Sequence, residues 1–331
     1  MKVVDMHCDT IAAVHDLKKE GNNVHVACNH LQLDLEKMKK GDYALQNFAL
    51  YTNLEKHERP FEYAMELVDT FYQELEAYPD QIGIVRSYAD IEKNMQEGRM
   101  SALLTLEEGE ECQGNLAYLR NFYRLGARMM TLTWNYENQL AYPNGVEVDG
   151  QGKKHTIPDT VHGLKERGIE FVQEMERLGM IIDISHLNDA GIWDVFKYTT
   201  KPFVASHSNA RALASHPRNL TDDMIRALAE RGGVMGINYY AFFLKDWEDP
   251  SKAESRVSDM VKHMKHIREI GGIGCIGLGS DFDGIDGTLE MKDCSYLPLL
   301  EAEMRKEGFT EDEIEAVFYK NVLRVYREVL R

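Results

Sequence analysis

The chain has 331 residues, 44% of them hydrophobic, and a formal net charge of −17. This length and composition predict a folded protein with a large core. The negative charge argues against nucleic acid and against an anionic membrane surface as partners. No apolar stretch is long enough to span a bilayer and no secretion signal opens the chain, so we expect a cytoplasmic protein without a membrane anchor.

Short apolar runs alternate with amphipathic helical patterns along most of the chain. The runs lie at 2–6, 46–51, 102–106, 129–133, 180–184, 202–205, 233–237 and 275–279. Two of the helical patterns lie at 163–179 and 222–233. Strands that alternate with helices are typical of a parallel sheet covered by helices, and about eight such strands favour a (β/α)8 TIM barrel of the α/β class. We expect one barrel domain over residues 1–331, with an open, doubly wound sheet as the alternative fold.

Three other segments complete the predicted chain order. Residues 134–160 are polar and rich in turn residues, which predicts a long loop after the fourth strand, at a face where loops tend to be functional. His263 and His266 lie in an amphipathic helical pattern among Lys and Arg, and we expect both on a solvated helix face. The last helices, at 296–307 and 310–330, are expected to pack outside the barrel.

Side chains of metal-ligand type follow five of the apolar runs: His7 and Asp9; Glu107; Asp183 and His186; His207; Asp281 and Asp283. Taken alone, each has an ordinary structural explanation, such as a carboxylate that caps a helix. Taken together they meet at one face of a barrel, because the carboxyl ends of all its strands lie there. Imidazoles and carboxylates in this number suit zinc or a similar divalent ion, and a carboxylate such as Glu107 could bridge two ions.

Several segments resemble the renal, or membrane, dipeptidase family of metal-dependent amidohydrolase-like barrels. They include "DMHCDT", "LLTLEEGE", "LGARMMTLTWNYEN", "ERLGMIIDISHL", "SHPRNL" and "GLGSDFDG", and the resemblance covers residues 1–331. It implies hydrolysis of dipeptides by a pair of divalent ions, expected to be Zn2+, with a D-configured C-terminal residue tolerated. It further implies a homodimer and this ligand set: His7 and Asp9 on one ion, His186 and His207 on the other, and Glu107 as the bridge.

The resemblance also assigns residues to the chemistry and to substrate binding. Asp281 matches the acid/base aspartate, Arg218 the arginine that holds the substrate carboxylate, and Tyr240 a tyrosine of the same pocket. Trp134 stands where the family often has a histidine that contacts the substrate, and the neighbouring Asn135 could donate a hydrogen bond in its place.

A second departure follows the bridging glutamate. Where the family often reads Gly-Gly-His, this sequence has Glu108-Gly109-Glu110, which adds two acids that could alter substrate preference.

Two other functions fit the same residues. One is an amidohydrolase-type barrel that acts on another small amide, a lactone or a phosphoester. The other is a barrel that holds metals without catalysis. The expected pocket of Arg218 and Tyr240 favours a substrate with a carboxylate, and the acid/base residue Asp281 favours an enzyme.

Overall fold

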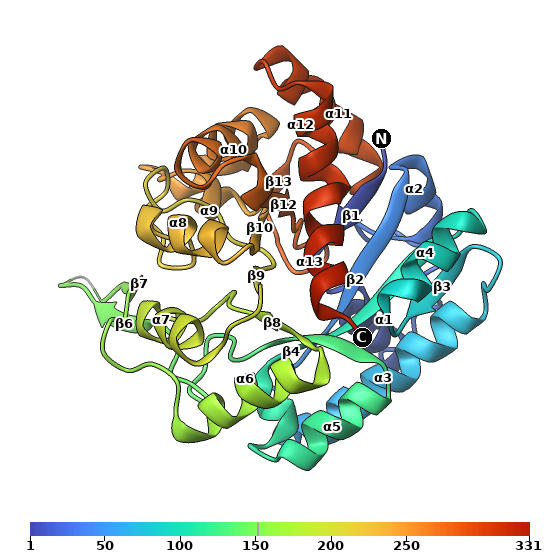
Figure 1. The fold of residues 1–331 in the computed structure, drawn as a ribbon, viewed down its shortest axis with the longest axis horizontal. Coiled ribbons are helices and arrows are strands. Elements are labelled where there is room, and N and C mark those ends of the chain that lie inside the picture. The colour runs from blue at the N-terminus through green and yellow to red at the C-terminus, as the bar shows by residue number, and fades with distance from the viewer. Residues whose placement is uncertain (151) are drawn as a thin grey trace.

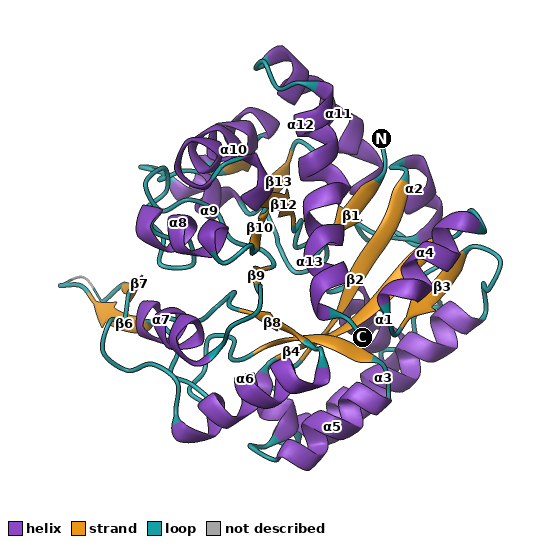
Figure 2. Ribbon diagram, in the orientation of Figure 1, coloured by secondary structure: helices purple, strands orange, loops and turns teal. Residues whose placement is uncertain are grey.

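The computed structural model describes residues 1–150 and 152–331. A ring of parallel strands runs in the order β2-β1-β12-β10-β9-β8-β5-β4 and is closed by pairing of β2 with β4. Its strands are β1 (Val3–Asp5), β2 (Tyr43–Tyr51), β4 (Met100–Glu107), β5 (Ala127–Thr131), β8 (Ile181–Asp183), β9 (Val204–Ala205), β10 (Val234–Ile237) and β12 (Ile276–Leu278). Figure 2 shows this ring inside a layer of helices. The predicted (β/α)8 TIM barrel is therefore confirmed, and the alternative open sheet is wrong.

One strand of the main sheet lies outside the predicted set. β3 (Ile82–Val85) pairs with the first half of β4, whereas β5 pairs with its second half. β2 pairs with the opposite edge of β4 over most of its length. β3 is therefore an addition beside the barrel rather than a member of the ring, and its short run with Gly83 gave little strand signal.

Helices connect the strands and cover the outside of the barrel, and the C-terminal helix lies across one of its ends (Figure 1). They are α1 (Thr10–Lys19), α2 (Leu35–Lys40), α3 (Pro60–Glu76), α4 (Tyr88–Gln96), α5 (Leu116–Arg124), α6 (Glu166–Leu178), α7 (Asp189–Tyr198), α8 (Asp222–Glu230), α9 (Ala241–Leu244), α10 (Val257–Gly271), α11 (Leu297–Lys306), α12 (Glu311–Glu315) and α13 (Asn321–Val329). α8 and α6 confirm the helical patterns predicted at 222–233 and 163–179. α8 begins after Thr221, whose hydroxyl accepts a hydrogen bond from the N–H of Met224, and α6 ends at Gly179 with φ of 79°.

Within residues 1–150 and 152–331, no helix has both the length and the hydropathy to cross a bilayer.

The segment predicted as a loop after the fourth strand contains regular structure. β6 (Gly145–Val148) and β7 (Lys154–Ile157) form an antiparallel hairpin, which projects at the edge of the molecule in Figure 1. A second small ladder joins β11 (Glu254–Ser255) to β13 (Thr288–Leu289). Neither pair was predicted, because short exposed strands lack the apolar runs that mark the barrel strands.

The C-terminal helix closes one end of the barrel instead of lying outside it. α12 continues into α13 through a π-helical turn at residues 316–320. Buried side chains of α13, among them Val322 and Tyr326, pack with Val4, Leu103 and Val234 of the barrel interior. The side-chain amide of Asn47 donates a 2.6 Å hydrogen bond to the Tyr326 hydroxyl. α13 thus fills the amino end of the barrel (Figure 1), so the carboxyl end is the one left for a binding site.

Candidate active site

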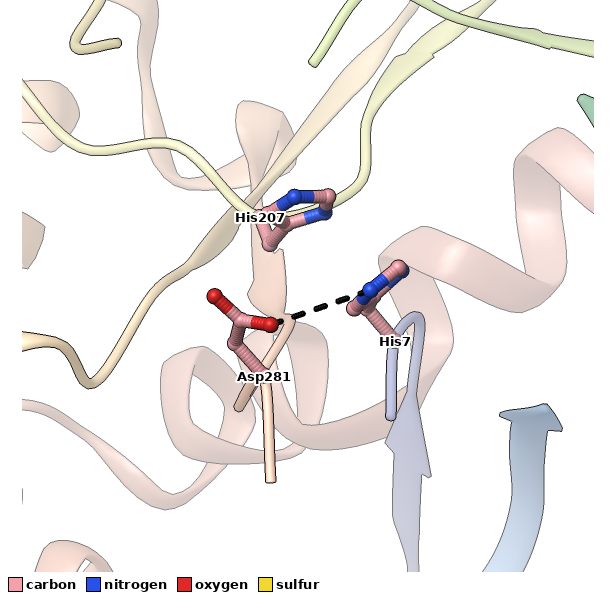
Figure 3. A group of neighbouring side chains, drawn as sticks. All are labelled: His7, His207 and Asp281. Atoms are coloured by element: carbon pink, nitrogen blue, oxygen red, sulfur yellow. Dashed lines mark ion pairs between the residues drawn. The ribbon is translucent and has the colours of Figure 1, made fainter. Parts of the chain in front are cut away.

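Residues of metal-ligand type converge at the carboxyl end of the barrel. Three groups each bring ligand atoms within 4.8 Å of one another: His7 with Asp9 and Glu107; Glu107 with His186 and His207; and His7 with His207 and Asp281. Figure 3 shows the third group, in which the Asp281 carboxylate faces the His7 and His207 rings. All these side chains are largely buried, so their convergence is a property of the core rather than of a solvated surface.

Glu107 lies between the two sets of histidines. Its Oε2 is 3.0 Å from Nε2 of His7, and its Oε1 is 3.2 Å from Nε2 of His186 and 3.6 Å from Nε2 of His207. Asp9 is on the His7 side, with Oδ2 3.5 Å from His7 Nε2. The two oxygens of one carboxylate therefore face two different groups, which is the arrangement of a bridging ligand.

The polar atoms of this cluster fit divalent ions better than they fit one another. His7 Nδ1 and Nε2 and Asp9 Oδ1 are buried without a hydrogen-bond partner among the described residues. Asp9 occupies the N-cap position of α1 yet makes no side-chain cap hydrogen bond. Burial lowers the pKa of His186 and His207 well below the usual range, which keeps both imidazoles neutral, as metal ligation requires. Nitrogen and carboxylate donors of this kind are typical of zinc sites.

Asp183 and Ser206 determine which nitrogen of His207 faces the cluster. Ser206 Oγ donates a 2.5 Å hydrogen bond to the carboxylate oxygen Oδ2 of Asp183. Because the single proton of the Ser206 hydroxyl is directed to Asp183, the Ser206 oxygen accepts the 2.7 Å hydrogen bond from His207 Nδ1. This leaves His207 Nε2 without its proton and pointing to His186 Nε2, 2.9 Å away. Asp183 thus acts through Ser206 to orient a candidate ligand.

Ser206→Ala should weaken zinc binding by about 10- to 100-fold, the usual effect of removing a hydrogen-bond partner of a metal ligand. Without the hydroxyl, Nδ1 of His207 loses its acceptor, and the ring is free to adopt the other tautomer. Competition against a chromogenic chelator measures the affinity. Ser215→Ala, which removes an exposed hydroxyl bonded to Asp246, is the control. Equal zinc affinity of Ser206→Ala and the parent protein would contradict this orienting role.

Asp281 lies at the border between the ligand cluster and the open cavity. Its Oδ1 is 3.7 Å from His7 Nε2, and its Oδ2 accepts a 2.9 Å hydrogen bond from Asn238 Nδ2. Burial raises the pKa of Asp281 to about 7, and the neighbouring charges of Asp9 and Glu107 act in the same direction. A carboxyl group with a pKa near neutral can both accept and release a proton.

The backbone at two of these residues is itself unusual. His186 and Asp281 have φ of 69° and 64°, a left-handed region that residues other than glycine seldom adopt. Such strain persists where the surrounding structure enforces it, and it gathers at functional sites.

A cavity of about 590 Å³ opens above the cluster and exposes Asp9, Glu107, His186 and Asp281 to a ligand. Arg218 lines one side of it and is 5% exposed. Its Nε has no hydrogen-bond partner and its guanidinium no ion pair among the described residues, and Nη2 donates only to the His207 carbonyl oxygen at 3.3 Å. A buried cation without a counter-ion, placed on a cavity wall, is suited to an anionic ligand.

Tyr240, His216 and Phe243 line the same side of the cavity as Arg218. The Arg218 guanidinium lies 5.4 Å from the centre of the Phe243 ring, and the centre of the His216 ring lies 4.6 Å from that same ring centre. His216 was missed in the sequence, although it stands two positions before Arg218 in "SHPRNL". Burial lowers the pKa of His216 to about 4, so its ring is neutral and adds no competing charge to the pocket.

Trp134 and Asn135 also line the cavity. Asn135 Oδ1 is 3.3 Å from Nδ1 of His186, so this side chain contacts a candidate ligand as well as the cavity. Glu108, expected as an extra acid near the substrate, instead points into the turn after β5. There it accepts hydrogen bonds from the backbone N–H of Trp134 at 2.9 Å and from the Asn138 side chain. Glu108 therefore supports the segment that carries Trp134.

The expectation of a solvated face for His263 is wrong. This side chain is fully buried, and its Nδ1 accepts a 3.1 Å hydrogen bond from the Ala210 N–H. Nε2 donates at 3.0 Å to the carbonyl oxygen of Leu244. His263 thus ties α10 both to α9, which carries Phe243, and to the segment after β9, which leads to Arg218. His266 is partly exposed and lies 2.7 Å from Asp222 Oδ1.

Comparisons with known proteins agree with this geometry. The family model described as membrane dipeptidase (Peptidase family M19) matches residues 1–331. Dipeptidase verJ of Clonostachys rogersoniana is 33% identical over 80% of this chain, and the match spans 64% of that relative. The crystal structure of dipeptidase AC, a metallopeptidase, is 27% identical with a TM-score of 0.91 and covers 100% of this chain and 99% of its own. A Rhodobacter sphaeroides metallopeptidase, solved with a phosphinate mimic of L-Ala-D-Ala, is 25% identical with a TM-score of 0.89 over 99% of both chains.

The family model leaves no part of the chain unmatched, and both solved metallopeptidases share the complete barrel. Together with the cluster of metal-ligand residues at the barrel mouth, these matches establish that the chain belongs to the membrane dipeptidase family.

Proposed function

We propose that this chain hydrolyses dipeptides with two zinc ions held by His7, Asp9, Glu107, His186 and His207 within one domain of residues 1–331. Membership of the family makes metal-dependent dipeptide hydrolysis its activity. The observation that carries the dipeptide assignment is the buried guanidinium of Arg218, which makes no ion pair with any described residue and lines the cavity beside the ligand cluster. A free carboxylate held there, so close to the reacting bond, limits the substrate to two residues.

Each side chain has a defined part in this proposal. Bound divalent ions supply a water of lowered pKa and polarise the scissile carbonyl. Asp281 accepts the proton of the attacking water and then delivers it to the leaving amine. Arg218 and Tyr240 hold the C-terminal carboxylate, and Trp134 and Asn135 line the side that receives the N-terminal residue.

Three finer points accompany the proposal. A D-configured C-terminal residue fits, because the Rhodobacter sphaeroides relative was solved with a mimic of L-Ala-D-Ala. A homodimer is expected, and the exposed apolar side chains of Val146, Val148 and Ile157 on the β6–β7 hairpin support it. A cytoplasmic location is supported by five cysteines that are all free thiols. Light scattering of the purified protein tests the dimer.

Elemental analysis of the metal, paired with hydrolysis of L-Ala-L-Ala and L-Ala-D-Ala before and after chelation, tests the function. Near two zinc ions per chain and cleavage that chelation abolishes are the expected results. Bound zinc without cleavage of either dipeptide, but with turnover of a lactone, a phosphoester or another amide, would move the assignment to those substrates.

Arg218→Met should lower kcat/KM for L-Ala-L-Ala by about 10²- to 10³-fold, mainly through KM, because a buried ionic contact to the substrate is lost. The dipeptide amide L-Ala-L-Ala-NH2 lacks the carboxylate and serves as the matched control substrate. It should be a poor substrate of the parent protein and respond little to the substitution. An equal loss on the acid and the amide would contradict the carboxylate clamp at Arg218.

A further inference from the structure

The side of the cavity away from Arg218 is built from aromatic rings. Tyr51 ends β2, and Trp134 lies in the turn after β5; we call this pair the aromatic wall. Their ring centres are 5.2 Å apart, and Tyr136 backs the indole at 5.2 Å. Both members line the cavity and are half-buried, so each is accessible to a ligand there.

The position of the wall follows from the strand order. β2 and β5 flank β4, so Tyr51 and Trp134 meet over the end of the strand that carries Glu107. The Trp134 ring centre is 5.8 Å from that of His186, whereas Arg218 contacts the carbonyl of His207. In the closed ring of strands, β2, which ends in Tyr51, stands across the barrel from β9, and the segment after β9 carries Arg218, so Tyr51 and Arg218 line opposite parts of the cavity.

This placement orients a dipeptide. With its carboxylate on Arg218 and its peptide bond at the ligand cluster, the side chain of the N-terminal residue reaches the aromatic wall. An aromatic wall gains most from a large apolar side chain, through buried area and ring contacts.

The wall is held in place before any ligand arrives. The backbone N–H of Trp134 donates a hydrogen bond to Glu108. Thr133 Oγ1 donates a 2.6 Å hydrogen bond to the Tyr136 carbonyl oxygen, and the Tyr136 hydroxyl donates one of 3.0 Å to Asn53. A rigid, uncharged surface costs little ordering free energy on binding.

We propose that the aromatic wall of Tyr51 and Trp134 makes this dipeptidase selective for substrates with a large apolar residue at the N-terminal position. The inference rests on the proposed function and on the orientation set by Arg218. Lys56, an exposed cation at the cavity rim, offers the competing choice of an acidic N-terminal side chain.

Two dipeptides of equal composition test the proposal with the zinc-loaded protein. L-Phe-L-Ala should exceed L-Ala-L-Phe in kcat/KM by about 10-fold or more, because only the first places its ring against the wall. Trp134→Ala should lower kcat/KM for L-Phe-L-Ala at least 10-fold more than for L-Ala-L-Ala, mostly through KM, and Trp134→Phe should recover most of that preference. Trp193→Ala removes an exposed indole on α7 and should leave all three rates unchanged.

Each alternative has its own result. A Trp134→Ala variant that loses the three substrates equally, or loses L-Ala-L-Phe selectively, would overturn the proposal. Faster cleavage of L-Glu-L-Ala than of L-Phe-L-Ala would overturn it in favour of Lys56. If the parent protein with zinc bound cleaves none of these dipeptides, the proposed function itself fails, which is a different outcome from a changed ratio.

Discussion

Asp281→Asn should lower kcat for L-Ala-L-Ala by about 10²- to 10⁴-fold, the range for loss of a general acid–base. Asparagine keeps the size of the side chain but can neither accept the proton of the attacking water nor return it to the leaving amine. The parent kcat/KM should fall as the pH drops below neutral, because burial raises the pKa of Asp281 and the base is lost once it is protonated. That acidic limb should disappear in the variant.

Asp283→Asn is the matched control for Asp281→Asn. It lies two positions further on, but its Oδ1 accepts a 2.6 Å hydrogen bond from the Gln32 N–H and its Oδ2 a 2.5 Å bond from the Thr10 hydroxyl. One oxygen holds the loop at Gln32 and the other the first residue of α1, so Asp283→Asn should alter stability more than kcat. Zinc content, measured on both variants, separates a lost base from a lost ligand. Parent-like turnover of Asp281→Asn with zinc bound would remove Asp281 from the acid–base role.

The residues at the strand ends could be predicted because each one breaks a continuous apolar run. Glu107 and His207 follow strands that read as hydrophobic on both faces, and a parallel barrel gathers such positions by topology alone. Their meeting at one face of the barrel can therefore be inferred from the order of strands and helices alone, without any distances. The relay from Asp183 through Ser206 to His207 depends on rotamers and could not be read from the sequence.

Other parts of the molecule depend on contacts that no local pattern records. His263 sits in an ordinary amphipathic helix, and it is buried where the loop at Ala210 and the end of α9 pack on α10 and bond to its two ring nitrogens. α13 resembles a surface helix, yet the open amino end of the barrel receives its apolar face. Glu108 follows a candidate ligand directly, but its backbone φ of 139° turns it away from the cavity. The positions of His263, α13 and Glu108 are therefore set by tertiary packing and not by the local sequence pattern.

Glu107→Gln should reduce the bound zinc to at most one ion per chain and lower kcat/KM by about 10³-fold or more, since both candidate ion sites lose a ligand at once. The carboxylate faces His7 with one oxygen and His186 with the other, and an amide can offer only its oxygen, to one side. Added zinc should also raise the melting temperature of the parent protein much more than that of the variant, because at a given concentration a ligand that binds more tightly stabilises the fold more.

Glu111→Gln distinguishes the loss of a ligand from the loss of any buried acid. Glu111 is as buried as Glu107, and burial raises its pKa well above the usual range, which favours the neutral acid that glutamine resembles. Its Oε1 accepts a 2.7 Å hydrogen bond from the Thr52 hydroxyl, which a glutamine oxygen can also accept. We therefore expect Glu111→Gln to keep two zinc ions and its stabilisation by zinc. Two tightly held ions in Glu107→Gln would show that the histidines and Asp9 suffice, and that Glu107 is not a bridge.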